Sequence, residues 1–427
     1  MRFLRDARVF PDVLWKRGPF RNLWAASTVS HFGTTFGALS LTALVYLDAS
    51  PRQMGVLAAS SSVPVLLVAI LAGVWVDRLP RIPVMIFADA GRFAALISVP
   101  VVAVSGELRV EQLYAVAFVT GCLGVAFSVA FSSTVPDVVP KERLVDANSA
   151  LGMSDSVAAS AGPAIGGGIV QAATAPVAML VDALTFLVSG VFLARVRIPA
   201  TRPAVKRRSA VVEALEGFRT AVEQPVLRAI LAMVATYSFF SGFIVTLYGL
   251  WVIDGLGFSA LTLGLLLAAG GAGSIFGAAL ASPLARGMGL GRSITTTYVM
   301  AAGLSFLTPV AGGPAWLALS MLACEQGIGD VLWSIHNIEA VSLRQTVTPE
   351  EQLGRVNAVF LFASLGLRPL GALVAGVTAE AAGLREGLLI SCVGINVAGL
   401  WLVFSPLRRF RQGVGGGRRT CPTRRCD

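Results

Sequence analysis

Ionisable side chains interrupt several long apolar runs of this 427-residue chain. Glu325, Arg368 and His31 lie near the middle of such runs, and Asp182 lies nearer the end of another. A charged group within hydrocarbon is costly, so it usually faces a cavity or a partner. Burial favours the neutral form of a carboxyl group, so such an acid can take up and release a proton. Glu325 is our leading candidate for this chemistry, with Asp182 and His31 behind it.

Each of these groups also has a plainer interpretation. If Arg368 is adjacent to Glu325, the two could form a fixed ion pair, or Arg368 could attract an anionic substrate. Asp182 is expected to be a structural hydrogen-bonding acid before a proton carrier, and a lone helix histidine such as His31 is often a packing residue. Asp89 and Arg92 are three residues apart on one helix face, which predicts an internal ion pair.

The elements that must position these groups are membrane-spanning helices. The chain is 55% hydrophobic and only 14% charged. A crossing of the ~30 Å hydrocarbon core needs roughly 20 apolar residues, and only helices or closed barrels satisfy the backbone there. The runs lack a period of two, which favours helices. Twelve spans are predicted, at 20–47, 53–76, 83–105, 112–135, 149–173, 176–196, 226–253, 259–284, 293–312, 314–338, 357–380 and 386–406.

The basic residues concentrate on one side of these spans. Of the 34 Lys and Arg residues, 29 fall on one side and two lie within spans, and the other side has only Arg52, Arg109 and Arg385. The positive-inside rule therefore predicts that both termini are cytoplasmic, and the bias toward arginine over lysine with compact loops suits the inner membrane of a bacterium. The formal charge of +10 is mostly a topology signal, and we expect no nucleic-acid partner.

The spans fall into two groups of six. The predicted division is a cytoplasmic segment 1–19, a bundle 20–196, a basic linker with an amphipathic helix 197–225, a bundle 226–407 and a disordered basic tail 408–427. A short repeat supports it, because Pro140, Glu142, Leu144 and Asn148 match Pro349, Glu351, Leu353 and Asn357, each 209 residues later. The equivalent loop recurs six spans on, so the halves have parallel topology.

A charged motif follows the second span. It reads Gly73-Val-Trp-Val-Asp77-Arg78-Leu-Pro-Arg81 and resembles the G-x-x-x-D-R-x-x-R loop of the major facilitator superfamily. The resemblance extends over 20–407 and is nearest to the bacterial drug and siderophore exporters, which include macrolide-efflux and enterobactin-exporter proteins. It implies an all-α fold of two pseudo-symmetric six-helix bundles, and a cytoplasmic gate formed by Gly73, Asp77, Arg78, Arg81, Asp89 and Arg92. The plainer interpretation is ordinary positive-inside charge beside a turn.

A second motif lies in the fifth span, at Gly162-Pro163-Ala-Ile-Gly166-Gly167. It resembles the G-P-x-x-G-G element associated with exporters that exchange substrate against protons. Tight helix packing alone would also explain these small residues. Two features of proton-coupled relatives are missing: Thr34, not an acid, follows Gly33, and the fourth span carries no arginine.

The predicted function is proton-coupled export of a small amphipathic or hydrophobic compound, by a monomer in the bilayer. The alternatives are an importer or facilitator of the same fold, and a non-transporting scaffold or sensor. We expect no catalytic residues, metal or cofactor, because the two histidines and five cysteines form no ligand cluster. The candidate cavity residues are Ser30, His31, Phe36, Phe127, Phe240, Tyr248, Glu325, Trp333 and Arg368.

The predicted topology can be tested by labelling intact cells with a thiol reagent that does not cross the membrane. In a cysteine-free background, Glu107→Cys should be labelled because it lies in an external turn. Arg207→Cys, in the connection between the halves, should react only after the cells are opened. Labelling of Arg207→Cys in intact cells would reverse the orientation.

Overall fold

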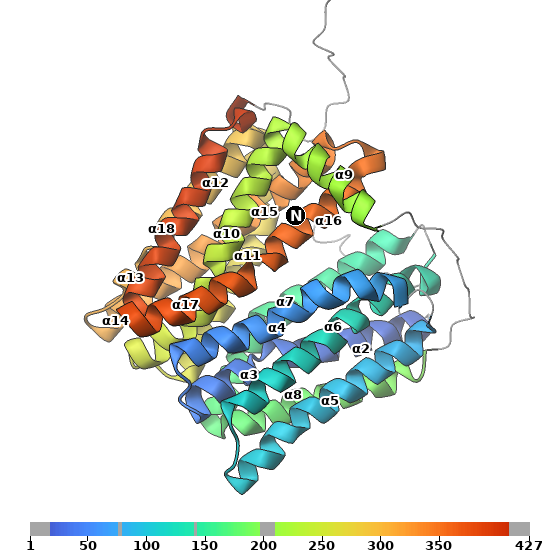
Figure 1. Cartoon of the computed structure of the whole chain (residues 1–427), viewed down its shortest axis with the longest axis vertical. Coiled ribbons are helices and arrows are strands. Elements are labelled where there is room, and N and C mark those ends of the chain that lie inside the picture. The colour runs from blue at the N-terminus through green and yellow to red at the C-terminus, as the bar shows by residue number, and fades with distance from the viewer. Residues whose placement is uncertain (1–17, 76–78, 141–142, 197–209, 410–427) are drawn as a thin grey trace, which may run out of the picture.

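The structure is a computed structural model that describes residues 18–75, 79–140, 143–196 and 210–409. Every regular element in these ranges is helical (Figure 1). The predicted N-terminal segment up to residue 17, the tail from residue 410, and the first part of the linker lie outside the described ranges, as do Asp77 and Arg78.

The helices of the first half form the N-terminal bundle. They are α2 (Gly18–Thr35), α3 (Ala38–Leu41), the π-helical turn η1 (Thr42–Tyr46), α4 (Pro51–Trp75), α5 (Arg81–Ser105), α6 (Val110–Val138), α7 (Leu144–Ala172) and α8 (Ala175–Leu193). The first predicted span is interrupted, because α2 ends before Gly37. This glycine has φ +65, a left-handed conformation that costs glycine little.

The second half forms the C-terminal bundle. Its elements are α10 (Pro225–Leu250), η4 (Trp251–Gly255), α11 (Ala260–Met288), α12 (Leu290–Leu304), α13 (Leu307–Val310), α14 (Ala315–Cys324), η5 (Glu325–Gly329), α15 (Asp330–Val347), η6 (Glu350–Gln352), α16 (Leu353–Gly366), α17 (Arg368–Ala382), α18 (Leu384–Val403) and η7 (Pro406–Arg409). The tenth predicted span is thus α14 and α15 joined by the π-helical turn η5. Such turns are rare and frequently mark functional sites.

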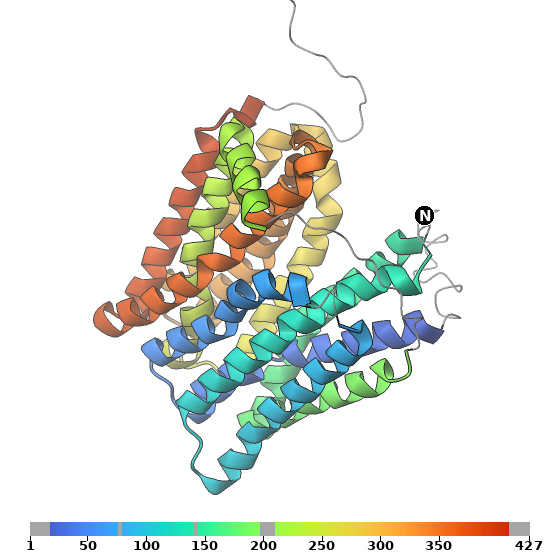
Figure 2. The same cartoon turned by 45° about the vertical axis from the view of Figure 1, so that its right-hand side comes forward.

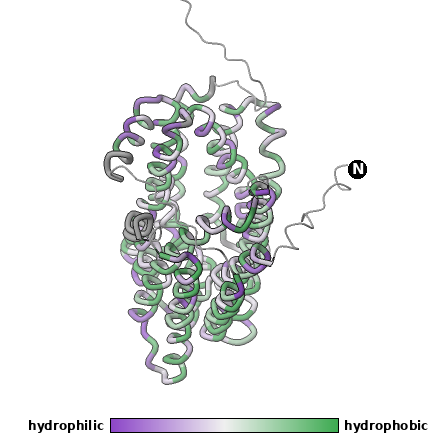
Figure 3. The backbone as a smooth tube through the Cα atoms, turned by 90° about the vertical axis from the view of Figure 1, so that its right-hand side faces the viewer, coloured by the Kyte–Doolittle hydropathy of each residue, from purple (hydrophilic) through white to green (hydrophobic). Residues whose placement is uncertain are grey.

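The outer surface is suited to lipid. Seven helices in the described part are long and apolar enough to cross a bilayer, and hydrophobic residues run along most of the helix lengths (Figure 3). Phe87, Phe276 and Phe362, on three different helices, are 71%, 67% and 62% exposed. Large aromatic side chains left open on many faces indicate a hydrocarbon environment.

The linker helix α9 (Ala210–Glu223) is attached to the C-terminal bundle. The Thr220 hydroxyl donates a hydrogen bond to Gln352 Oε1 at 2.8 Å, and Glu216 forms an ion pair with Arg355. Gly217 packs on the carbonyl of Arg355, where a Cβ would lie only 2.6 Å from that oxygen. We call the end of the molecule that carries α9 the linker end.

The 209-residue repeat is confirmed in the backbone. The first residues of α4, α5, α7 and α8 (Pro51, Arg81, Leu144 and Ala175) each lie 209 residues before the first residues of α11, α12, α16 and α18 (Ala260, Leu290, Leu353 and Leu384). The π-helical turns η1 and η4 obey the same offset, whereas η5 has a regular stretch of α6 at the equivalent position. In η1 the N–H of Leu47 donates to Thr42 O, and in η4 the N–H of Leu256 donates to Trp251 O.

The apolar core is shared at one end of the molecule and divided at the other. One cluster of buried residues includes Phe36 and Leu44 of the N-terminal bundle together with Phe243 and Leu250 of the C-terminal bundle. We call this end the joined end. Toward the linker end, two further clusters each contain residues of one bundle only. The bundles therefore pack together at the joined end and part toward the linker end.

Two pairs of helices make the contact between the bundles. Helix α4 packs on α17, and α7 packs on α11; Figure 1 and Figure 2 show both pairs side by side. Gly55 of α4 packs on the carbonyl of Ala372, where a Cβ would lie 2.6 Å from the oxygen. Gly264 of α11 packs still more closely on the carbonyl of Pro163. Both members of the second contact lie 209 residues from their counterparts in the first.

A second pair of contacts between the bundles is related by the same offset of 209 residues. Gly376 of α17 packs on the carbonyl of Pro51, where a Cβ would lie 2.7 Å away, and Gly167 of α7 packs on the carbonyl of Ala260. Glycine permits this close backbone approach because it has no side chain. Among the residues that the structure describes, no side-chain hydrogen bond or ion pair joins the bundles. We call these four contacts the glycine crossings.

The glycine crossings predict that an added methyl group at these positions lowers the stability of the protein. Gly55→Ala and Gly264→Ala should each destabilise the protein by about 1–3 kcal/mol, because the methyl group meets backbone that cannot move aside. The apparent melting temperature in detergent would report it. The matched control is Gly303→Ala, a helical site with no atom within 4 Å of the added Cβ, where alanine should be neutral or stabilising. Equal melting temperatures for all three variants would contradict this account.

Candidate functional site

A cavity of about 560 Å³ lies within the C-terminal bundle. Its walls come from α10, α11, α12, η5, α15, α16, α18 and the first residue of α17. The charged side chains that line it are Glu325, Asp330, Arg344 and Arg368. Two acids therefore face two arginines in a space large enough for a small molecule.

One face of α15 and η5 supplies much of the polar wall. Gln326, Asp330, Trp333, Asn337 and Arg344 all line the cavity, and their spacings of four, three, four and seven residues follow the helical period. This face carries amide and acidic groups at its η5 end and arginine at its last turn. The cavity wall therefore changes its charge along the helix.

Aromatic rings of α10 and α12 meet rings of α15 in the lining. Tyr237 stacks on Trp333 with ring centroids 4.1 Å apart, and Tyr298 meets His336 edge to face at 4.9 Å. The Tyr298 hydroxyl donates to Ile395 O at 2.8 Å, and His336 Nδ1 lies 2.9 Å from Ile294 O. These polar atoms are held by backbone partners, so the rings are fixed in place and present flat apolar faces.

Glu325 begins the π-helical turn η5 and lies at the cavity wall. One of its carboxylate oxygens is buried without a hydrogen-bond partner. Arg368 lines the same cavity, but no ion pair between the two residues exists in the described part of the chain. The fixed bridge is therefore not formed in this conformation, and Glu325 keeps a free oxygen.

The predicted ion pair in the N-terminal bundle is confirmed. Arg92 Nη1 lies 3.7 Å from Asp89 Oδ1, and both residues are buried. The Ser189 hydroxyl donates to Asp89 Oδ2 at 2.6 Å. The Arg92 guanidinium lies between the rings of Phe127 and Phe186, 4.7 and 4.9 Å from their centroids. This cluster is a closed packing unit, which a cation–π sandwich stabilises.

Of the nine predicted cavity residues, Glu325, Trp333 and Arg368 line the cavity. The other six lie elsewhere. Ser30 and Phe36 are buried in the N-terminal bundle and His31 is exposed on α2. Phe127 covers Arg92, Phe240 packs on Phe239 and Phe243, and Tyr248 is buried in the core of the joined end.

The gate residues are only partly described. Gly73 lies in the last turn of α4. Arg81 donates a hydrogen bond to Ser133 O at 2.6 Å and forms an ion pair with Asp137. Both partners are on α6, so Arg81 is bound within its own bundle.

The glycine-proline motif of α7 is a packing surface. Gly162 and Gly166 receive Thr35 and Phe36, at the interruption of the first span. Pro163 and Gly167 take part in the glycine crossings described above. The motif therefore contacts the interruption of the first span on one side and the C-terminal bundle on the other side.

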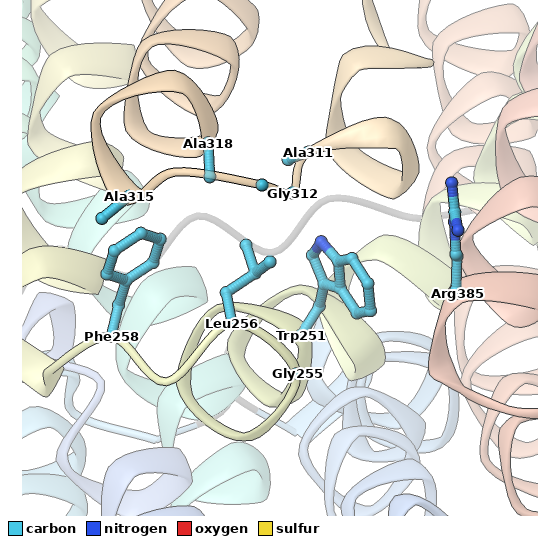
Figure 4. Close-up of a pocket in the computed structure, with 10 residues that line it drawn as sticks. Trp251, Gly255, Leu256, Phe258, Ala311, Gly312, Ala315, Ala318 and Arg385 are labelled. Carbon is cyan, nitrogen blue, oxygen red and sulfur yellow. The ribbon is translucent and has the colours of Figure 1, made fainter.

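A second hollow, of about 550 Å³, lies at the joined end of the C-terminal bundle. Figure 4 shows Trp251, Leu256 and Phe258 facing the loop at Ala311 and Gly312, with Arg385 at one side. Its polar groups are engaged, because Trp251 Nε1 donates to Thr308 O at 2.8 Å and Arg385 Nε donates to Pro309 O at 2.9 Å. It offers a ligand little chemistry.

The sequence reasoning missed Tyr237, Asp330, Asn337, Tyr298 and His336 as lining residues. For Asp330 and Asn337 a signal was present, because they share a helical face with Gln326 and Trp333. For Tyr237 and Tyr298 no such signal exists. Aromatic residues in apolar helices are equally suited to packing.

Comparisons with known proteins agree with this architecture. The model of the transmembrane secretion effector family matches residues 15–415. The multidrug efflux pump Tap of Mycolicibacterium fortuitum is 26% identical, over 92% of this chain and 97% of its own length. The enterobactin exporter EntS of Salmonella typhimurium is 27% identical, over 80% of this chain and 81% of its own.

A solved structure extends the comparison to the fold. The inward-facing structure of a bacterial homologue of the iron transporter ferroportin has a TM-score of 0.70 at 16% identity. It aligns over 90% of this chain and 97% of its own. Two linked six-helix bundles, the glycine crossings and the family match together identify the group: the chain belongs to the major facilitator superfamily of membrane transporters, within the transmembrane secretion effector family.

Proposed function

We propose that this transporter exports a small amphipathic or hydrophobic compound, driven by proton entry, and binds it in the cavity of the C-terminal bundle. The observation that carries the proposal is the composition of that cavity. It combines flat aromatic walls with two acids and two arginines. Export is supported by the names of two relatives, an efflux pump and an exporter.

The bundle arrangement fits the uptake step of an export cycle. The separate cores at the linker end would allow substrate to enter between the bundles from that side. The excess of Lys and Arg at that end would make it cytoplasmic, with both termini inside the cell. The ferroportin homologue that shares this fold is in an inward-facing state. Rocking of the two bundles, 20–196 against 226–407, about the glycine crossings would then expose the cavity to the outside.

Glu325 is suited to couple that motion to protons. Its carboxyl group has a partner-free oxygen at the cavity wall, so substrate and proton would compete for the same group. Ionised Glu325 would hold substrate in the conformation open to the cytoplasm. Protonation from outside would release it, after which the neutral acid could return across the low-dielectric midplane.

The glutamate assignment predicts a selective loss. Glu325→Gln in proteoliposomes should abolish ethidium movement driven by an imposed pH difference, because glutamine cannot carry a proton. Ethidium exchange between equal concentrations on both sides, which needs no net proton movement, should persist but require higher ethidium concentrations, because the neutral glutamine also holds the substrate less tightly. Glu107→Gln, an exposed acid at the turn between α5 and α6, is the matched control. Full pH-driven transport by Glu325→Gln would exclude Glu325.

The aromatic wall predicts an effect on affinity. Trp333→Ala should raise the half-saturating ethidium concentration roughly fivefold, because one aromatic stacking contact contributes about 1 kcal/mol. Trp316→Ala is the control, because Trp316 is 68% exposed on the outer surface. Identical saturation curves for the two variants would place the binding site outside this cavity.

A further inference from the structure

The N-terminal bundle buries a charge excess that the cavity mechanism does not use. Asp89, Arg92 and Asp182 are 1%, 7% and 6% exposed, and Arg92 interacts electrostatically with both acids. Two carboxylates against one guanidinium leave one negative charge uncompensated. A buried unpaired charge costs several kcal/mol, so such a cluster neutralises itself by binding a proton.

The surroundings decide which acid holds that proton. Asp89 receives a hydrogen bond from Ser189 and the ion pair with Arg92, and both favour its ionised form. Oδ1 of each acid is buried without a hydrogen bond, but Asp89 Oδ1 has Arg92 Nη1 at 3.7 Å, whereas no ion pair joins Asp182 to Arg92 among the described residues. The neutral form therefore belongs on Asp182.

The helix that packs on Asp182 supports the same assignment. Gly33 of α2 lies against this carboxyl group, and a Cβ there would be only 2.5 Å from Asp182 Oδ1. Gly33 is two residues from the end of α2 at Thr35. In the last turn of α2, the carbonyls of Phe32 and Gly33 accept from the Thr35 hydroxyl and the Phe36 N–H, and each carbonyl oxygen has a second lone pair that can accept another donor. A protonated carboxyl group can donate to such acceptors, whereas a carboxylate can only accept.

We propose that Asp182 is a second proton-binding site, which holds one proton at neutral pH independently of Glu325. Of the other charges on the helices packed on α8, Arg21 is exposed, Arg81 is bound to Ser133 and Asp137 of α6, and Asp146 pairs with Arg143. Helix α5 supplies Asp89 and Arg92, and α3 and η1 carry no ionisable side chain except Tyr46, which is exposed. On α2 and α7, His31 and Asp155 are exposed and point elsewhere.

The position of the site connects it to the contact between the bundles. Gly33 leads into the interruption of the first span, where Thr35 and Phe36 pack on Gly162 and Gly166 of α7. The same stretch of α7 makes two glycine crossings. Loss of the proton would place a charge against the end of α2, next to the surface on which the bundles turn.

Infrared spectroscopy of the full-length protein in lipid tests the proposal without a substrate. The wild-type protein should show the C=O stretching band of a protonated buried carboxyl group at neutral pH, and Asp182→Asn should lack it. Asp89→Asn should also lose it, because Arg92 is then balanced by an ionised Asp182. Glu325→Gln should keep it, which separates this test from the proposed function.

Isotope labelling provides the same test in the unmutated protein, so it does not depend on the folding of a variant. Carbon-13 at the aspartate side-chain carboxyl should shift the band, and labelled glutamate should leave it in place. An unchanged carboxyl region in Asp182→Asn, or retention of the band in Asp89→Asn, would overturn the proposal.

Discussion

Backbone packing at four glycines, beside the shared apolar core of the joined end, holds the two halves of this transporter together. At each crossing a glycine of one bundle meets a carbonyl group of the other, and in the described residues no polar side chain reinforces the contact. Hydrogen bonds or ion pairs across the bundles would have to break at every turnover. Two bundles that meet only through close van der Waals contacts can turn against each other at little cost in free energy, because no buried polar group loses its partner. The composition of this interface therefore suits repeated movement.

The two bundles have the same backbone arrangement but different side chains in their interiors. Where the first carries Asp89 and Asp182, the second carries Tyr298 and Ser391, 209 residues later. Phe127, which covers Arg92, corresponds to His336 beside the cavity. The first bundle therefore encloses a sealed charge cluster, and the second encloses open space lined by rings and charges. In our proposals, these different side chains at equivalent positions give the first bundle a proton site at Asp182 and the second bundle the substrate cavity with Glu325.

The fold follows from the sequence because hydrophobic length and charge asymmetry act over whole helices. The ion pair of Asp89 and Arg92 was also predictable, since it depends only on spacing along one helix. The cavity was not. Depth along a span can be counted from its ends, but the rotation of each helix depends on packing with its neighbours. Phe240 and Tyr248 therefore pack in the core, although the position of each along its span predicts a place in the cavity. The turn η5, which positions Glu325, likewise has no periodic signal.

The paired contacts have a consequence for the origin of the chain. Gly55 on Ala372 and Gly264 on Pro163 are one contact made twice, with the roles of the bundles exchanged. This reciprocity is the geometry of an isologous dimer, in which one patch binds its own copy. An ancestor half as long could have formed the same interface by self-association. After fusion of the two copies, the interior residues of each half would have diverged while the residues of the interface between the halves were kept.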